Sequence, residues 1–314
     1  MNGDCAIPCI DIAPLFAGAS PVRDAADRAI LAAATGSGFM TVTGLPPFVP
    51  IGAGTRRELL RIFSLPADAV PRPQIYIYRG WFPLREDADC CMEGIDIGPE
   101  IAYGPTMIDP ADPLREQTPL PPEDILPGWQ LTAGTYYRGM ERTAEALMRG
   151  IARGLGLAAE TFDAAFAGGN STLRLVRYPA RGSRDKTALS AHADLGFITL
   201  LAQHHIPGLQ ARSHSGTWLD VPPQEGTLVV NFGKLLGRWT GERIRATEHR
   251  VLGSNRERFS IPFFYEPSVD AEIAPLPLSE GGDFAPFRYG DYVRGTSRLR
   301  RGVRKRQEAS RVSG

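Results

Sequence analysis

Beyond Gly168-Gly169, the sequence becomes a series of short apolar runs separated by Gly, Pro, Ser and Asp. These separating residues favour turns, so each run predicts one short β-strand. The expected strands are Leu173–Tyr178, Phe197–Ala202, Leu209–Arg212, Trp218–Val221, Thr227–Phe232, Ile244–Val251 and Arg258–Tyr265. Strands this short and evenly spaced are typical of a double-stranded β-helix, the jelly roll, in which two sheets pack face to face.

The first half of the chain carries the helical signals. Leu131–Leu155 has apolar residues at every third or fourth position, which predicts a long scaffold helix. The segment Pro66–Pro127 is rich in Pro, Asp and Gly and lacks periodicity, which predicts loops with short elements. Shorter elements are expected as helices over Val22–Thr35 and Gly54–Ile62 and as strands over Ile7–Ile12 and Gly38–Gly44.

These patterns predict an α+β fold with a mainly β core and flanking N-terminal helices. A length of 314 residues suits one catalytic domain with an N-terminal elaboration. We expect an N-terminal region over 1–127 packed on the core, scaffold helices over 128–168, a jelly-roll core over 169–295 and a basic tail over 296–314. For the tail, a solvated and frayed segment is favoured over a nucleic-acid-binding arm.

The charge balance excludes several classes of partner. Lys plus Arg and Asp plus Glu both number 35, so no overall field draws the protein to nucleic acid or to an anionic membrane. No stretch approaches the roughly 18 consecutive apolar residues of a membrane span. The expected partner is a small-molecule substrate, and no feature of the sequence specifies the oligomeric state.

The four cysteines match neither a disulfide framework nor a zinc ribbon, so reduced thiols are expected. Cys90-Cys91 is interpreted as a thiol pair in a loop, with a redox or metal site as the alternative. Met1–Asp11 has no basic segment followed by an apolar run, so no secretory leader is predicted and a cytoplasmic location is expected.

His192-Ala193-Asp194 and His249 form a pattern of metal ligands. A two-residue spacing on an extended strand points both side chains to one side of the sheet. Two imidazoles and one carboxylate on one face of a metal leave three positions open, as expected for a non-haem Fe(II) centre that activates O2. His-x-Asp alone is common by chance, and the later motifs in the chain make the metal interpretation the favoured one.

Arg258-Phe259-Ser260 is the second chemical motif. Arg258 and Ser260 lie on the same face of a predicted strand. A guanidinium fork beside a hydroxyl suits a carboxylate, because the fork gives paired charge-assisted hydrogen bonds.

With these residues the chain resembles the 2-oxoglutarate and Fe(II)-dependent oxygenases of the isopenicillin N synthase-like superfamily. The likeness covers most of the chain, including Ile7–Asp11 through Gly38-Phe39 and the glycine-bounded Gly94–Gly98. Its specific motifs occur in the family's order: His192–Leu201, Gly208-Leu209-Gln210, Val229–Gly233, His249-Arg250-Val251 and Arg258–Phe264.

The resemblance implies a catalytic centre in which His192, Asp194 and His249 bind Fe(II). It implies 2-oxoglutarate as co-substrate with O2, its distal carboxylate held by Arg258 and Ser260 with help from Tyr178. Phe264 matches a position on the substrate side in some relatives.

The chain departs from the family pattern at three positions. Val176 stands where many members have an Asn that assists the co-substrate, and Lys234 stands where an Asp commonly follows the Asn-x-Gly turn. Glu248 precedes His249 where Pro or a small residue is frequent, and it is expected either to tune the metal or to pair with an arginine.

Other residues have two interpretations each. Arg174, with Arg177 on the same predicted strand, faces either the pocket or solvent, and Arg174 is a candidate for holding an acidic substrate. Ordinary packing competes with a role in roofing the pocket for Trp81, Phe82 and Tyr103. A solvated loop is favoured for the remaining histidines His204, His205 and His214.

The leading functional hypothesis is a 2-oxoglutarate-dependent non-haem iron dioxygenase. It hydroxylates, desaturates or cyclises a small organic molecule and releases succinate and CO2. The alternative is an Fe(II) oxidase like isopenicillin N synthase, which uses the Arg-x-Ser pair for a substrate carboxylate. A non-catalytic metal-binding module, with the basic tail as its contact surface, is the third.

Overall fold

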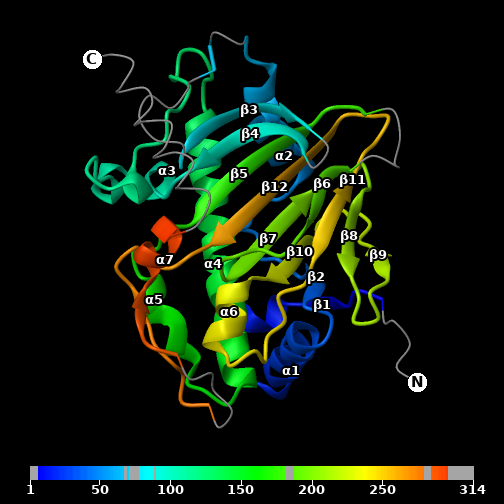
Figure 1. Cartoon of the computed structure of the whole chain (residues 1–314), viewed down its shortest axis with the longest axis vertical. Helices are drawn as coiled ribbons and strands as arrows, with labels where there is room; N and C mark the ends of the chain where they lie inside the picture. Colours follow the sequence, from blue (N-terminus) through cyan, green and yellow to red (C-terminus); the bar gives the residue numbers. More distant parts are fainter. Residues whose placement is uncertain are drawn as a thin grey trace.

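The computed structural model describes residues 6–66, 69–70, 78–87, 90–181, 187–278 and 284–295. Cys5 and the predicted tail over 296–314 lie outside these residues. Two β-sheets form the centre of the described structure, and helices pack against the larger sheet (Figure 1). The predicted α+β architecture with a mainly β core is confirmed.

The larger sheet has eight strands, which are antiparallel except for the pair β1 and β2. In spatial order they are β1 (Cys9–Asp11), β2 (Phe39–Thr43), β10 (Leu228–Phe232), β7 (Ile198–Gln203), β12 (Arg258–Tyr265), β5 (Thr172–Tyr178), β4 (Cys91–Ile97) and β3 (Gly80–Glu86).

The smaller sheet has four strands: β6 (Thr187–His192), β11 (His249–Leu252), β8 (Leu209–Arg212) and β9 (Trp218–Asp220). An apolar cluster joins the two sheets, with Phe39 and Val176 from the larger sheet against Leu209 and Val251 from the smaller. This face-to-face packing is that of a jelly roll. A separate two-stranded ribbon consists of β13 (Glu272–Ile273) and β14 (Phe287–Arg288).

The long helix α4 (Trp129–Gly154) supports the larger sheet. Its buried stripe, which includes Tyr137 and Met140, recurs with the helical period and packs into the main core. The helix α1 (Pro21–Thr35) packs beside it, and Ser20 caps α1 by accepting a hydrogen bond from the backbone N–H of Arg23. The other helices are α2 (Ala53–Leu60), α3 (Glu100–Tyr103), α5 (Asp163–Phe166), α6 (Lys234–Trp239) and α7 (Tyr289–Gly295), with 3-10 turns at Ala13–Phe16, Arg61–Ser64, Pro105–Met107, Pro113–Arg115 and Ala159–Phe162.

Most predicted elements are confirmed to within two residues, and the described part of Pro66–Pro127 consists of loops with short elements, as predicted. It contains β3 and β4, two strands of seven residues each that extend the larger sheet beyond β5. Local alternation of apolar and polar residues is weak here because β4 is stabilised by pairing with β5, a partner distant in the sequence, and β3 by pairing with β4.

The strand predicted over Ile244–Val251 is wrong in its first half, since β11 begins only at His249. The preceding residues bond to the last turn of α1 and to the loop after it instead of to a sheet: Arg245 N–H donates to the carbonyl of Ala34, and the Thr247 hydroxyl donates to that of Ser37. The extended strand expected at His192 is β6, which ends at this residue, and the helix α6 was not predicted. No helix within the described ranges is both long and apolar enough to cross a bilayer.

Gly94 lies at a point of β4 where the neighbouring strands β3 and β5 leave no room for a side chain. A Cβ at this position would lie 2.1 Å from the carbonyl oxygen of Leu175 and 2.6 Å from Cζ of Phe82. We therefore expect Gly94→Ala to lower the free energy of unfolding by about 1–3 kcal/mol, as overpacking does. Urea denaturation measures this. Gly54→Ala is the control, because that site on α2 has no atom within 4 Å of the added Cβ and alanine favours helix. Equal stability of both variants would contradict the prediction.

Candidate metal centre

His192 and His249 lie side by side on two paired strands of the smaller sheet. His192 is the last residue of β6, His249 is the first of β11, and the two are directly opposite in the register. The spacing predicted that Asp194 lies on the same strand as His192. This is wrong, because Asp194 lies in the loop that follows the strand. The backbone N–H of Lys234 at the start of α6 donates to the Asp194 carbonyl and so fastens this loop.

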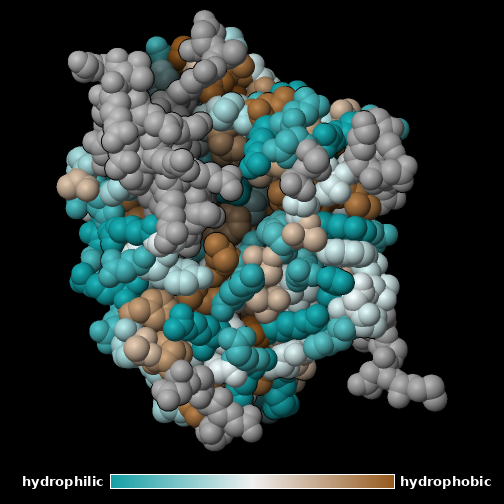
Figure 2. Space-filling model, viewed as in Figure 1, coloured by the Kyte–Doolittle hydropathy of each residue, from teal (hydrophilic) through white to brown (hydrophobic). Residues whose placement is uncertain are grey.

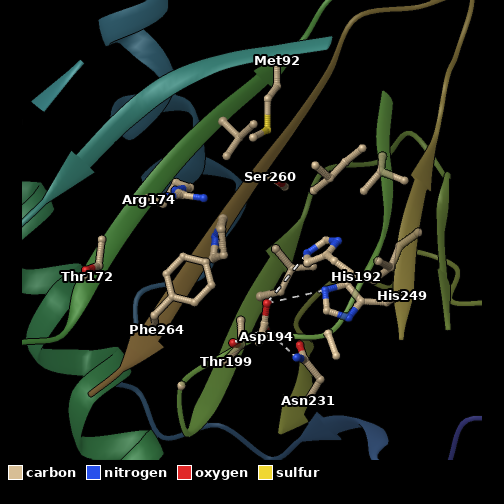
Figure 3. Close-up of a pocket in the computed structure, with 18 of the residues that line it drawn as sticks. Met92, Thr172, Arg174, His192, Asp194, Thr199, Asn231, His249, Ser260 and Phe264 are labelled. Carbon is tan, nitrogen blue, oxygen red and sulfur yellow. Dashed lines mark hydrogen bonds and ion pairs between the residues drawn. The ribbon is translucent and has the colours of Figure 1, made fainter. Parts of the chain in front are cut away.

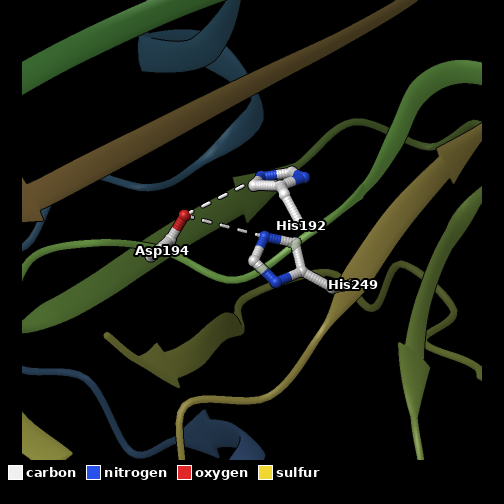
Figure 4. A group of neighbouring side chains, drawn as sticks. All are labelled: His192, Asp194 and His249. Atoms are coloured by element: carbon white, nitrogen blue, oxygen red, sulfur yellow. Dashed lines mark ion pairs between the residues drawn. The ribbon is translucent and has the colours of Figure 1, made fainter. Parts of the chain in front are cut away.

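The three side chains converge on one point (Figure 4). Oδ1 of Asp194 lies 3.8 Å from Nε2 of His192 and 3.8 Å from Nε2 of His249. The three ligand atoms lie within 4.8 Å of one another, close enough to share one metal ion. Two nitrogens and one carboxylate oxygen on one side of a metal suit a non-haem Fe(II) centre with open positions.

Both imidazoles are oriented by backbone carbonyls. Nδ1 of His192 lies 2.9 Å from the carbonyl oxygen of Ser190, and Nδ1 of His249 lies 3.1 Å from that of Thr247. A carbonyl only accepts, so Nδ1 carries the proton and Nε2 presents its lone pair to the metal position. Burial and the neighbouring His249 lower the pKa of His192, which keeps its ring neutral at pH 7.

Two polar side chains orient the carboxylate. Oδ2 of Asp194 accepts hydrogen bonds from the Thr199 hydroxyl at 2.6 Å and from Nδ2 of Asn231 at 2.7 Å, which leaves Oδ1 for a metal. Burial favours the protonated acid, but His249 and these two hydrogen bonds outweigh it, so the pKa of Asp194 lies below its ordinary value. Neither role was predicted from the sequence, although Thr199 and Asn231 lie within the motifs that carry the family resemblance.

Removing either donor should loosen the carboxylate without removing a ligand. We expect Asn231→Ala and Thr199→Val to weaken Mn(II) binding by roughly 10- to 100-fold, as losses of such outer partners do. Calorimetric titration under nitrogen measures this. Thr135→Val is the control, because that hydroxyl lies on the exposed side of α4, where it donates to the Leu131 carbonyl and accepts from Arg138, and it does not line the cavity. Unchanged metal affinity in Asn231→Ala would contradict the proposed orientation.

A cavity of about 300 Å³ opens beside the three side chains, between the two sheets (Figure 3). The molecular surface has a hollow near the centre of this face, with apolar side chains in and around it (Figure 2). Residues of β5, β6, β11 and β12 line the cavity, among them Tyr178, Val176, Ser260 and Phe264. The eight residues predicted for the site therefore all line this cavity: His192, Asp194, His249, Arg258, Ser260, Tyr178, Phe264 and Arg174.

Arg258 is the buried cation of the cavity. It is 2% exposed, its guanidinium carbon lies 5.1 Å from the centroid of the Tyr178 ring, and its Nε donates to the Ile206 carbonyl at 3.2 Å. Its Nη1 is buried without a hydrogen-bond partner among the described residues. Burial lowers the pKa of Arg258, against the effect of Tyr178. An unpaired buried donor of this kind suits a carboxylate ligand, because it is costly to leave unsatisfied.

The structure shows the contacts of the three positions that depart from the family pattern. Val176 is buried on the cavity wall and offers no hydrogen bond from its side chain. Glu248 pairs with Arg212 at 2.6 Å, so its predicted pairing with an arginine is confirmed. Lys234 begins α6 and fastens the Asp194 loop through its backbone.

The aromatic residues of the N-terminal region separate into different roles. Trp81 packs against Phe63, and Tyr103 is 46% exposed and bonds to Glu141, so both lie outside the cavity lining. Phe82 packs against the guanidinium of Arg174, which does line the cavity. His204 and His205 lie in the turn between β7 and β8, as predicted.

Comparison with known proteins agrees with this geometry. Residues 169–267 match the family model described as the 2OG-Fe(II) oxygenase superfamily. The chain is 30% identical to the 2-oxoglutarate-Fe(II) type oxidoreductase hxnY of Emericella nidulans, over 92% of this chain and 88% of that protein. It is 29% identical to isopenicillin N synthase of Streptomyces clavuligerus, over 91% of this chain and 93% of that protein.

Solved structures show the same fold. A full-length protein of Neurospora crassa in complex with alpha-KG superposes with a TM-score of 0.82 at 26% identity, covering 97% of this chain and 98% of that one. The same Neurospora protein with alpha-KG and thymine gives a TM-score of 0.80.

Proposed function

The chain belongs to the 2OG-Fe(II) oxygenase superfamily, and on that basis we propose that it oxidises a C–H bond of a small organic molecule while 2-oxoglutarate is converted to succinate and CO2. Its cofactors are those of the family, Fe(II) and 2-oxoglutarate. Hydroxylation, desaturation and ring closure all fall within the proposal, because each begins with removal of a substrate hydrogen.

One observation carries the proposal: the three converging metal-binding groups share a cavity with a buried guanidinium nitrogen of Arg258 that has no hydrogen-bond partner in the part of the chain that the structure describes. We assign Nε2 of His192, Nε2 of His249 and Oδ1 of Asp194 as the iron ligands. Bound iron supplies the activation of O2 and the oxidative decarboxylation of 2-oxoglutarate.

The chain's own residues position the co-substrate. We propose that Nη1 of Arg258 and the hydroxyl of Ser260 hold the distal carboxylate of 2-oxoglutarate, with the Tyr178 ring keeping the guanidinium in place. Arg258 and Ser260 are 2% and 3% exposed, so the carboxylate they hold is shielded from water. This shielding strengthens the charge-assisted hydrogen bonds.

The size of the cavity supports a small substrate. About 300 Å³ is at the lower end of ligand pockets, and part of it must hold 2-oxoglutarate. The thymine complex of the Neurospora protein is consistent with a substrate of this size, although thymine itself is not proposed for this chain.

Product analysis tests the proposal. Fe(II)-loaded protein is incubated with O2, 2-oxoglutarate carrying a labelled C1 carboxylate and a panel of small organic molecules. We expect labelled CO2 and succinate in equal amounts, with at least one panel member raising the rate. Absence of decarboxylation under every condition, in protein that binds the metal, would refute the proposed reaction.

A further inference from the structure

Arg174 lies on the cavity wall that faces the metal-binding side chains (Figure 3). Its guanidinium pairs with Asp96. The two residues are opposite each other in the register of β5 and β4. Nε of Arg174 donates to Oδ1 of Asp96 at 2.6 Å, and Nη2 donates to Oδ2 at 2.9 Å. These two hydrogen bonds make the pair bidentate. Its carboxylate is almost fully desolvated, because Asp96 is 3% exposed.

We propose that the Arg174–Asp96 pair selects an uncharged substrate through a carbonyl-type hydrogen-bond acceptor. This inference rests on the proposed function. It replaces the expectation that Arg174 holds an acidic substrate.

The geometry leaves one part of Arg174 available. Nε and Nη2 are used by Asp96, whereas Nη1 has no hydrogen-bond partner among the described residues. The guanidinium carbon lies 5.2 Å from the ring centroids of both Phe82 and Phe264, which restricts its position. A fixed N–H donor on a wall of the cavity is suited to one acceptor atom of a ligand.

The charges of the cavity argue against a substrate carboxylate. Asp96 already neutralises Arg174, and the proposed co-substrate uses Arg258. Apart from Arg174, Arg258 and the metal-binding group, the one charged side chain among the described residues of the lining is the acid Glu266. A second carboxylate would therefore meet no uncompensated cation among these residues, whereas an amide or ketone oxygen carries no charge and is less costly to desolvate.

The rest of the wall fits an apolar body. Phe264, Met92, Leu189 and Val176 line the same cavity as Arg174. The expected substrate class is a small uncharged molecule with an apolar or aromatic skeleton and one carbonyl or amide oxygen directed at Arg174.

Matched ligands test this selection even while the natural substrate is unidentified. The probes are pairs that differ only in carrying a carboxamide or a carboxylate: benzamide and benzoate, cyclohexanecarboxamide and cyclohexanecarboxylate, isobutyramide and isobutyrate. Mn(II) replaces iron, 2-oxoglutarate is saturating, and dissociation constants come from relaxation of probe protons by Mn(II), which detects binding near the metal. We expect the amides to bind at least about tenfold more tightly than the carboxylates.

Variants separate recognition from structural support. Asp96→Asn should leave Arg174 charged but unneutralised, which raises carboxylate affinity by about tenfold and narrows or reverses the preference. A merely structural role for the pair would not change the ratio of the two affinities. Arg177→Met is the control, because Arg177 lies on the same strand but pairs with Glu93 and Glu257 away from the cavity.

The native protein alone can overturn the inference. Equal or tighter binding of the carboxylates, or no binding of either class, would do so, even if the Asp96 variant did not fold. The affinity for 2-oxoglutarate is measured in the same samples. Failure of the native protein to bind 2-oxoglutarate would instead count against the proposed function.

Discussion

Asp194→Ala is expected to abolish turnover and to weaken Mn(II) binding by more than the roughly 10- to 100-fold loss expected for the outer partners of a metal site. The substitution removes the only carboxylate among the three converging groups. His192→Ala should act in the same way, because its Nε2 is the ligand atom. Calorimetry under nitrogen measures metal affinity, and succinate formation measures turnover.

The fold should survive both changes. The His192 side chain is 38% exposed and borders a cavity, so its removal leaves no closed void in the core. Removing Asp194 leaves Thr199 and Asn231 without their shared acceptor, so a small fall in thermal stability is expected there. Asp220→Ala, at an exposed carboxylate on β9, is the control. Loss of folded protein at unchanged metal affinity would mean that the cluster is structural.

Arg258→Met is expected to raise the concentration of 2-oxoglutarate needed for half-maximal rate by roughly 10- to 100-fold. This range corresponds to the loss of about 1.5–3 kcal/mol from hydrogen bonds to a charged group. Mn(II) affinity should remain within about twofold of the native value, because Arg258 is not among the metal-binding groups. Titration of the metal-loaded protein with 2-oxoglutarate gives the binding constant directly.

The matched control for this change is Arg256→Met. Arg256 lies just before β12 and is exposed, with a contact to His205. It should leave the requirement for 2-oxoglutarate unchanged. If both arginine variants raised that requirement equally, the effect would come from the general charge of the region and not from a carboxylate site at Arg258.

The strands that carry the site could be predicted because their signals are local. β5, β8 and β12 begin and end within one residue of the predicted bounds, since apolar runs between turn residues mark them clearly. In contrast, β4 depends on pairing with β5, where Arg174 lies 78 residues after its partner Asp96, and β3 depends in turn on pairing with β4. Such long-range pairing leaves little trace in the local sequence.

The same distinction holds within the site. The motifs that contain His192, Asp194, His249 and Arg258 identified the residues to consider, but not their hydrogen bonds. That Asp194 lies past the end of β6, and that Thr199 and Asn231 share its Oδ2, depends on how β7 and β10 meet the loop. The neutralisation of Arg174 by Asp96 likewise required the register of two strands, which the sequence does not encode locally.

The most direct test of the central account is calorimetric titration of the native protein with 2-oxoglutarate under nitrogen, with and without Mn(II). The account predicts binding of one equivalent in the presence of the metal, strongly weakened without it and in Arg258→Met. Saturable Mn(II) binding together with no detectable binding of 2-oxoglutarate would contradict it, and would favour an iron oxidase in which Arg258 binds a carboxylate of the substrate.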